Sequence, residues 1–416
     1  MNFNKIFCFL TLCYLPVFAG AAEKHYVGGD ISLLPEYISA GAPYMDEDGN
    51  KIDLLPYLHE IGMNAMRVRL FVDPEAFPGE QDPNACQSLP FIIPLCKDIV
   101  GQDFDLVLDF HYSDTWADPS KQFTPDAWKD LSDEQLIAKI YEYTKETLTS
   151  LKDEGIVPKF IQPGNEISYG MLWGPYGNAG EGNKTYINGD SKAWERLCSL
   201  LKSAISACKE VCPDAEIILH TERVGDISVQ NNFYNQMNKY GVGYDIIGLS
   251  YYPYFHGNMS VLNSALTSLE KNFPDKDIMI VETGYPYAWE VNGTDQKVNY
   301  DYSLDGQDLF AHELVGTLLS HNSVTGLFWW WLEYNAYGTS LENWYNAPLF
   351  DSRTGKATPA LKTICGFATG YNALEDIYDE SGSAGGLWYD LNGNSYETPP
   401  RNGIYIHNGK KILVKP

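Results

Sequence analysis

The chain has 416 residues, of which 44% are hydrophobic and 14% aromatic. This length suits one α/β barrel of roughly 250–400 residues with a short appendage. The formal net charge of −26 argues against nucleic acid and anionic polymers as partners and suits a neutral ligand.

The N-terminus has the pattern of a secretory signal. A basic Lys5 precedes an apolar run over residues 6–18 and a group of small residues at 19–22, where we expect cleavage. The sequence therefore predicts an exported protein, in the periplasm, at the cell surface or outside the cell. Lipid attachment at Cys13 is the less favoured alternative, because Leu12 stands where a small residue is usual. No later apolar run reaches the roughly 20 residues that a membrane helix needs.

Short apolar segments then alternate with longer amphipathic ones, as βα units require. We expect eight strands, at 26–29, 65–70, 105–110, 160–162, 216–219, 246–250, 278–281 and 326–330. We expect clear helices at 133–154, 191–211, 261–272 and 307–320, and Ser132 with Gln135 predicts a capping box for the first of them. Eight alternations over roughly 350 residues predict a (β/α)8 TIM barrel, although periodicity alone leaves a doubly wound open sheet as an alternative.

The C-terminal segment has a different composition. After Gly370 the chain becomes rich in Gly and Asn, and Asn-Gly pairs between β-rich runs predict small hairpins. The ending at 401–416 is similar to short C-terminal tails of exported proteins from some Gram-negative bacteria; the alternative is a strand pair docked on the barrel. The predicted organisation is a signal peptide at 1–22, a catalytic barrel at 23–370 and a short β-rich tail at 371–416.

Six cysteines remain after signal cleavage: Cys86, Cys96, Cys198, Cys208, Cys212 and Cys365. They lack the clustering and the histidine partners of a zinc site, so we expect disulfides or buried thiols. The sequence predicts neither a bound metal nor a cofactor.

Two glutamates follow apolar strands directly. Glu166 follows Gln162-Pro163-Gly164-Asn165 at the end of the fourth predicted strand, and Glu282 directly follows the seventh. Strand ends of a barrel form its active face, so both carboxyls are expected to face the barrel mouth. Paired carboxyls perform glycoside hydrolysis, with one as acid/base and the other as nucleophile. The alternative for either one alone is a salt bridge with Arg67 or Arg69.

Further side chains that bind sugars well follow other predicted strands. They are His111 after the third, His220 after the fifth, Tyr251 and Tyr252 after the sixth, and Trp329–Trp331 at the end of the eighth. Any one of them could be a structural residue, but a ring of them around two carboxyls indicates a sugar cleft. Asn165 is a candidate donor to the sugar 2-hydroxyl, and a Trp is a candidate floor beneath the ring.

These residues resemble glycoside hydrolase family 53, the arabinogalactan endo-β-1,4-galactanases, within the clan of barrels that carry catalytic Glu on strands four and seven. The most specific stretch is Asp109-Phe110-His111-Tyr112-Ser113-Asp114-Thr115-Trp116-Ala117-Asp118-Pro119-Ser120-Lys121-Gln122. Other matching stretches are 29–32, 64–74, 164–173 and 248–253. The resemblance extends over about residues 26–368.

The resemblance implies Glu166 as acid/base and Glu282 as nucleophile of a retaining, endo-acting enzyme on β-1,4-galactan. It implies substrate-binding roles, direct or through a neighbour, for Asp30, Arg69, His111, Asp114, Trp116, Asp118, Asn165, His220, Tyr251 and Trp330. The expected partners are galactan, arabinogalactan or galacto-oligosaccharides, and the expected state is a monomer.

The chain departs from the family pattern at two places. Glu-Thr-Asn-Trp-Pro is usual after the seventh strand, and here the stretch is Glu282-Thr283-Gly284-Tyr285-Pro286. Trp-Glu-Pro is usual after the eighth, and here it is Trp330-Trp331-Leu332-Glu333, followed by a short loop. We therefore do not extend to this chain the calcium site that some bacterial members hold there. The departures bear on substrate length and subsite preference rather than on the chemistry.

Three other functions fit parts of the pattern. Another clan member, such as a mannanase, xylanase or cellulase, would share the two glutamates but lack the stretch 111–122. A galactan-binding barrel without activity would not need both glutamates and Asn165 intact. A metal-dependent hydrolase would need a cluster of His and Asp ligands that the sequence lacks.

Overall fold

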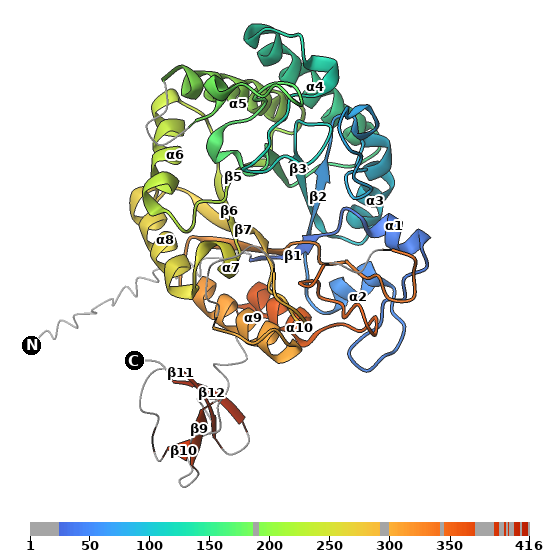
Figure 1. The fold of residues 1–416 in the computed structure, drawn as a ribbon, viewed down its shortest axis with the longest axis vertical. Helices are drawn as coiled ribbons and strands as arrows, with labels where there is room; N and C mark the ends of the chain where they lie inside the picture. The colour runs from blue at the N-terminus through green and yellow to red at the C-terminus, as the bar shows by residue number, and fades with distance from the viewer. Residues whose placement is uncertain are drawn as a thin grey trace, which may run out of the picture.

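The protein is a (β/α)8 TIM barrel, as the sequence predicted. The computed structural model describes residues 25–185, 191–291, 299–341, 345–370, 387–390, 395–396, 398, 403–407 and 410–414. Strands β1 to β8 follow one another in chain order and close into a barrel. Figure 1 looks along this barrel and shows the helices as an outer ring around the strands.

All eight predicted strands are present, within a few residues of the predicted bounds. They are β1 (Tyr26–Asp30), β2 (Ala65–Leu70), β3 (Asp105–Phe110), β4 (Phe160–Pro163), β5 (Glu216–Thr221), β6 (Ile246–Tyr251), β7 (Asp277–Thr283) and β8 (Val324–Trp329). Each pairs in parallel with its neighbours, and β1 closes the ring against β8. Parallel strands place all their carboxyl ends on one face, which brings distant segments of the chain together there.

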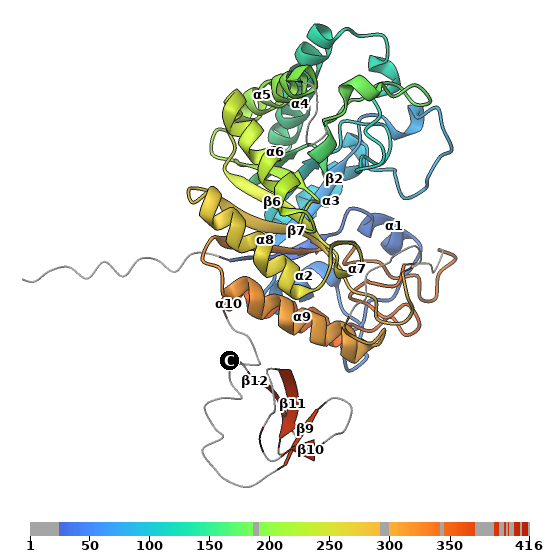
Figure 2. The ribbon, with the colours of Figure 1, turned by 60° about the vertical axis from the view of Figure 1, so that its left-hand side comes forward.

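The helices also follow the barrel pattern. They are α1 (Leu34–Ser39), α2 (Leu54–Glu60), α3 (Leu89–Gly101), α4 (Asp133–Asp153), α5 (Ser191–Val211), α6 (Ile227–Tyr240), α7 (Pro253–His256), α8 (Met259–Asn272), α9 (Leu304–Leu319) and α10 (Pro359–Thr369). Helix α4 begins with the predicted capping box, in which Ser132 accepts from the Gln135 amide and Gln135 accepts from the Ser132 amide. Figure 2 shows α8, α9 and α10 packed along one flank of the strands.

Alternate residues of the strands face inward and outward. A compact cluster that includes Ala65, Val107, Phe160, Ile218 and Phe328 fills the lower part of the barrel interior. Residues two positions further along the same strands also face inward, and there they are polar, for example Arg67, Asp109 and His220. The barrel therefore has an apolar base beneath a polar upper layer at the active face.

The segment after the barrel contains a second sheet. Strands β9 (Trp388–Asp390), β10 (Ser395–Tyr396), β11 (Gly403–His407) and β12 (Lys410–Val414) pair antiparallel in the order β10-β9-β11-β12, dark red in Figure 1. The predicted hairpins are thus present, whereas the predicted signal peptide lies outside the described residues. Among the described residues, none of the helices is both long and apolar enough to cross a bilayer.

The six cysteines that follow the predicted signal are free thiols, and all but the half-buried Cys86 are buried. Of the two alternatives that the sequence left open, the structure therefore shows buried thiols. Burial raises the pKa of Cys96 to about 12, so this thiol is protonated and unreactive at neutral pH.

Candidate active site

A cleft of about 570 Å³ lies at the carboxyl ends of the strands. It has the size of a typical small-ligand site. Its walls are formed by Trp116, Ala117, Asp118, Pro119, Asn165, Glu166, Glu222, Arg223, Tyr252, Tyr254, Phe255, His256, Glu282, Trp330 and Tyr345. Both predicted catalytic glutamates are among them.

Glu282 lies near the end of β7 with a cation beside it. The Arg67 guanidinium is 2.9 Å from Glu282 Oε1, and the Tyr252 hydroxyl donates to Oε2 at 3.2 Å. Burial raises the pKa of Glu282 to about 7, although Arg67 and Tyr252 favour the ionised form. Near neutral pH a substantial fraction of this carboxyl is therefore ionised and able to act as a nucleophile.

An irregularity in β7 turns Glu282 toward the cleft. Val281 belongs to the interior cluster, so in a regular strand the next side chain would face outward. The pairing register shifts at this point, because Leu249 pairs with Ile280 whereas Ser250 pairs with Glu282. The extra residue on β7 lets Glu282 also face the barrel interior, as β-bulges beside active sites commonly do.

Glu166 follows β4 in a tight turn. Its backbone is left-handed, with φ 48° and ψ 52°, and it directly precedes the short 3-10 helix η3 (Ile167–Tyr169). This conformation costs a non-glycine residue about 1–2 kcal/mol, and such strain is common at functional sites. The Ser250 hydroxyl donates to Glu166 Oε1 at 2.6 Å. Ser250 is also the residue of β6 that pairs with Glu282 in the strand register.

Glu166 has no cation as a direct partner among the described residues. Burial and the charges of Glu282 and Glu222 raise the pKa of Glu166 well above its usual value, although the Ser250 hydrogen bond opposes them. These effects favour the protonated form of Glu166, in which it can act as an acid. Two carboxyls with separated pKa values are the arrangement that acid and nucleophile roles require.

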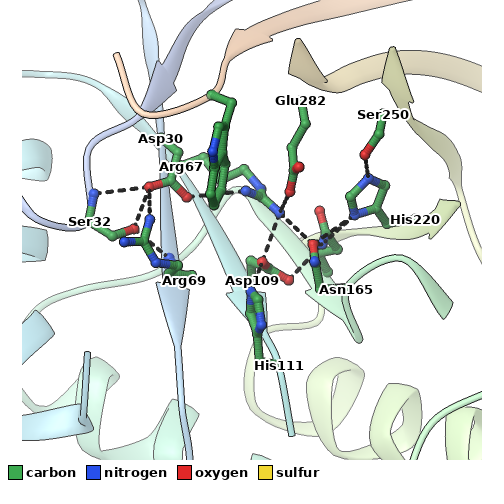
Figure 3. Close-up of polar contacts among 12 residues, drawn as sticks. Asp30, Ser32, Arg67, Arg69, Asp109, His111, Asn165, His220, Ser250 and Glu282 are labelled. Atoms are coloured by element: carbon green, nitrogen blue, oxygen red, sulfur yellow. Dashed lines mark hydrogen bonds and ion pairs between the residues drawn. The ribbon is translucent and has the colours of Figure 1, made fainter. Parts of the chain in front are cut away.

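Arg67 connects Glu282 to a buried network of charges (Figure 3). Its terminal nitrogens are 3.1 Å from Asp30 Oδ2, 2.7 Å from Asp109 Oδ2 and 2.9 Å from Asn165 Oδ1. All four side chains are at most 5% exposed. Burial opposes the charge on Asp109, but Arg67 and His111 outweigh it and lower the Asp109 pKa. The network therefore holds Arg67 charged and in a fixed position.

His220 connects the remaining polar residues (Figure 3). Its ring lies 2.9 Å from Asn165 Oδ1 and 2.8 Å from Ser250 Oγ. Burial and the charge of Arg67 lower the His220 pKa well below its usual value, so the ring is neutral. A neutral His220 contacts Ser250, which bonds Glu166, without adding a charge beside that carboxyl.

The chain is similar to known proteins over most of its length. Residues 26–364 match Glycosyl hydrolase family 53. The chain belongs to this family. It is 31% identical over 376 residues to a probable arabinogalactan endo-β-1,4-galactanase A of Neosartorya fischeri, covering 86% of this chain and 96% of that protein.

Two further similar proteins match most of the chain. An arabinogalactan endo-β-1,4-galactanase of Cellvibrio japonicus is 30% identical, over 80% of this chain and 89% of that one. The family 53 catalytic domain of Ignisphaera aggregans superposes with a TM-score of 0.73 at 30% identity, covering 86% of this chain and 99% of that structure. The predicted family is thereby confirmed.

The residues that the family resemblance implied fall into two groups. Those lining the cleft are Trp116, Asp118, Asn165 and Trp330, together with both glutamates. Those buried behind its walls are Asp30, Arg69, His111, Asp114, His220 and Tyr251. None of the second group is among the residues that line the cleft.

Two of the buried residues, Arg69 and Tyr251, are not placed to contact a substrate directly. Arg69 pairs with Asp30 at 2.6 Å and lies 4.6 Å from the Trp116 ring centre, whereas Arg67 is the arginine that reaches Glu282. The Tyr251 hydroxyl donates to the Gly257 carbonyl on the outer side of the strand, whereas its neighbour Tyr252 donates to Glu282. The salt bridge that the sequence left as an alternative therefore exists, and it supports the site.

Asp114 has a structural position. Its carboxylate accepts from the Asp73 amide at 3.0 Å and from the Asp126 amide at 2.7 Å. It thereby anchors the loop that presents Trp116, whose indole donates to Asp82 at 2.7 Å. Asp118 lines the cleft and accepts from the Ser120 amide at 2.8 Å.

Sequence reasoning included Tyr252 in the ring of sugar-binding side chains, but it did not assign Arg67, Ser250, Glu222 and Arg223 to the site, nor the cleft residues Tyr254, Phe255, His256 and Tyr345. Three of these share a signal that the sequence does contain. Arg67, Ser250 and Glu222 each lie at even spacing from an interior residue of the same strand, so they point inward. No group of three or more potential metal ligands occurs among the residues that the structure describes.

Proposed function

We propose that this protein is an endo-acting, retaining β-1,4-galactanase that cleaves galactan or type I arabinogalactan. The observation that carries the proposal is the pair of carboxyls in one cleft, Glu282 beside a cation and Glu166 without one. The endo-β-1,4-galactanase names of the family 53 relatives support the substrate.

The reaction would proceed by double displacement. Glu166 gives its proton to the glycosidic oxygen while Glu282 attacks the anomeric carbon and forms a glycosyl ester. Water then attacks that ester, with Glu166 now acting as base. A separation of roughly 5–5.5 Å between the two carboxyls suits this route.

Neighbouring side chains would bind the sugar at the cleaved bond. Trp330 supplies a flat indole surface, which lies 5.2 Å from the Arg69 guanidinium beneath it. Asn165 gives one amide hydrogen to the Ala117 carbonyl at 2.9 Å, which leaves the other for the 2-hydroxyl. Tyr252 keeps Glu282 oriented for attack.

The test compares linear β-1,4-galactan with mannan, xylan and β-1,4-glucan. We expect a rapid fall in galactan viscosity with short oligosaccharides as products, and little hydrolysis of the other three. Preferred cleavage of mannan, xylan or glucan would instead identify another enzyme of the clan. Galactan binding without turnover would identify a binding protein.

We further propose that the enzyme is exported by a leader over residues 1–22. The basic start and the apolar run of that segment support this proposal. N-terminal sequencing of the mature protein from its natural host would test it, with cleavage expected near Ala22. Monomeric state, absence of nucleic-acid binding and the division into barrel and tail stay predictions.

A further inference from the structure

The cleft extends past the acid Glu166 along a wall that the family resemblance did not assign. This wall consists of Glu222 and Arg223 after β5, with Phe255 and His256 of α7. The two segments abut, because a side chain added at Gly225 would meet the His256 carbonyl oxygen at 3.1 Å. We call these four residues the acid-side wall.

Arg223 is held rigidly in this wall. Its Nε lies 2.8 Å from Glu222 Oε1 and 3.1 Å from Ser168 Oγ, and its guanidinium carbon lies 4.0 Å from the Tyr169 ring centre. An arginine fixed by an ion pair and by an aromatic ring loses little further entropy when it binds a ligand.

The end of the Arg223 guanidinium remains available. The contacts to Glu222 and Ser168 use only Nε, and the two terminal amino groups have no hydrogen-bond partner among the residues that the structure describes. Each carries two N–H donors in a planar fork. The side chain is 22% exposed at the cleft surface. This is a preformed set of donors facing the cleft.

The acid-side wall lies where the leaving chain must be. The acid donates its proton to the leaving oxygen, so the leaving sugar lies beside Glu166 and away from the nucleophile. Ser168, which contacts Arg223, is two residues after Glu166 in the η3 turn. Arg67, on the opposite side of the site, serves Glu282 instead.

The chemistry of this wall suits a neutral sugar. The Glu222 carboxylate offsets the charge of Arg223, so the pair offers hydrogen bonds without selecting for an anion. Phe255 is 54% exposed and provides an apolar ring beside these donors. Donors next to an exposed ring can bind the hydroxyls and the apolar face of a hexose together.

We propose that Arg223, assisted by Phe255, binds the first sugar of the leaving chain and is a specificity-determining residue for it. This inference rests on the proposed function and names a subsite of the same cleft. Under this proposal the enzyme recognises a leaving galactose unit rather than any leaving group.

The experiment compares two leaving groups in Arg223→Ala and Arg223→Lys. One substrate is linear galactotetraose, whose leaving group is a sugar, and the other is 4-nitrophenyl β-1,4-galactobioside, whose leaving group is nitrophenol. For Arg223→Ala we expect kcat/KM to fall about 10–100-fold on galactotetraose and less than about 3-fold on the nitrophenyl substrate. Arg223→Lys keeps the charge but loses the fork, so its loss on galactotetraose should be intermediate.

Arg353→Ala is the matched control. Arg353 also pairs with a neighbouring acid, Asp351 at 3.1 Å, and lies 5.5 Å from the Tyr287 ring centre, but it is outside the cleft lining. It should leave both rates unchanged. Phe255→Ala, a change at an exposed side chain, should reproduce the split between substrates even if Arg223→Ala folds poorly.

Two results would overturn the inference. One is an equal loss on both substrates in Arg223→Ala and Phe255→Ala, which would indicate a structural role. The other is no loss on galactotetraose in either variant. A wild-type enzyme that hydrolyses neither substrate would overturn the proposed function itself, and is thereby distinguishable from failure of this subsite alone.

Discussion

The two sides of the barrel mouth hold their carboxyls in opposite ways. On the β1–β3 side, Arg67 reaches Glu282 from within a set of buried charges. On the β4–β6 side, Glu166 meets the Ser250 hydroxyl, which is backed by a neutral His220. Burial raises the pKa of both glutamates, and a cation beside Glu282 opposes that rise, whereas beside Glu166 only the Ser250 hydroxyl does.

The largest expected effect comes from removing the nucleophile. Glu282→Gln keeps the shape of the side chain but cannot attack, so kcat on linear galactan should fall on the order of 10⁴-fold or more. In Glu282→Ala, which leaves room for a small anion, azide should restore turnover and give a glycosyl azide of inverted configuration. Glu313→Gln is the control, because Glu313 bonds Tyr300 outside the cleft lining and its loss should leave the rate within about 3-fold. Near-normal turnover of Glu282→Gln would rule out its assigned role.

A smaller effect should separate the two arginines of β2. Arg67→Lys loses the planar fork that holds Asp109, Asn165 and Glu282 together, so kcat/KM should fall about 10–100-fold. With the cation less well placed, the pKa of Glu282 rises, and the acidic limb of the kcat/KM profile should move to higher pH. Arg69→Lys is the matched variant, since Arg69 pairs with Asp30 and not with Glu282. Equal shifts in both variants would contradict a specific Arg67–Glu282 pair.

On the opposite side, Ser250→Ala should have a milder effect. Loss of the hydroxyl removes the donor that favours ionised Glu166, so the pKa of Glu166 rises and the alkaline limb of kcat/KM moves to higher pH. The rate should fall about 3–10-fold, the usual effect of one hydrogen bond. Ser264→Ala, at an exposed position of α8, is the control. An alkaline limb that moves to lower pH would show that Ser250 does not act in this way.

The last effect concerns stability rather than rate. The pKa of Glu282 is about 7 in the folded protein and near 4.5 in the unfolded chain. The folded protein therefore holds this proton to higher pH, and the contribution of Glu282 to the free energy of unfolding falls as pH rises from about 4.5 to about 7. Glu282→Gln should relieve this cost by up to about 3 kcal/mol at pH 8, with little benefit at pH 4. Thermal unfolding of both proteins at the two pH values would measure it, and a variant less stable at pH 8 would contradict the expectation.

The sequence was most informative where local pattern and chemistry agree. Strands such as 105–110 are short apolar runs bounded by polar residues, and Asn165-Glu166 follows one of them, so both the barrel and the position of Glu166 at its mouth were predictable. Arg67 was harder to assign, because two arginines at i and i+2 share one face and only their depth in the barrel distinguishes them. Glu282 faces inward through a shift in pairing register that alternation alone would not predict.

The acid-side wall could not be assigned from local pattern. Arg223 follows an inward-facing Glu222, and its orientation depends on Ser168 and Tyr169 from another strand's loop. Phe255 reaches the same cleft from α7, a helix of 4 residues that was not expected. Such contacts join segments far apart in the chain, and they depend on packing that no single segment encodes.

The central claim is that Glu166 and Glu282 work as an acid and a nucleophile on one galactosidic bond. The most direct test follows, by proton NMR, the anomer released first from linear galactan, before mutarotation mixes the two forms. The account predicts the β-anomer, because two inversions at the same carbon restore the starting configuration. Initial release of the α-anomer would mean a single displacement by water and would contradict it.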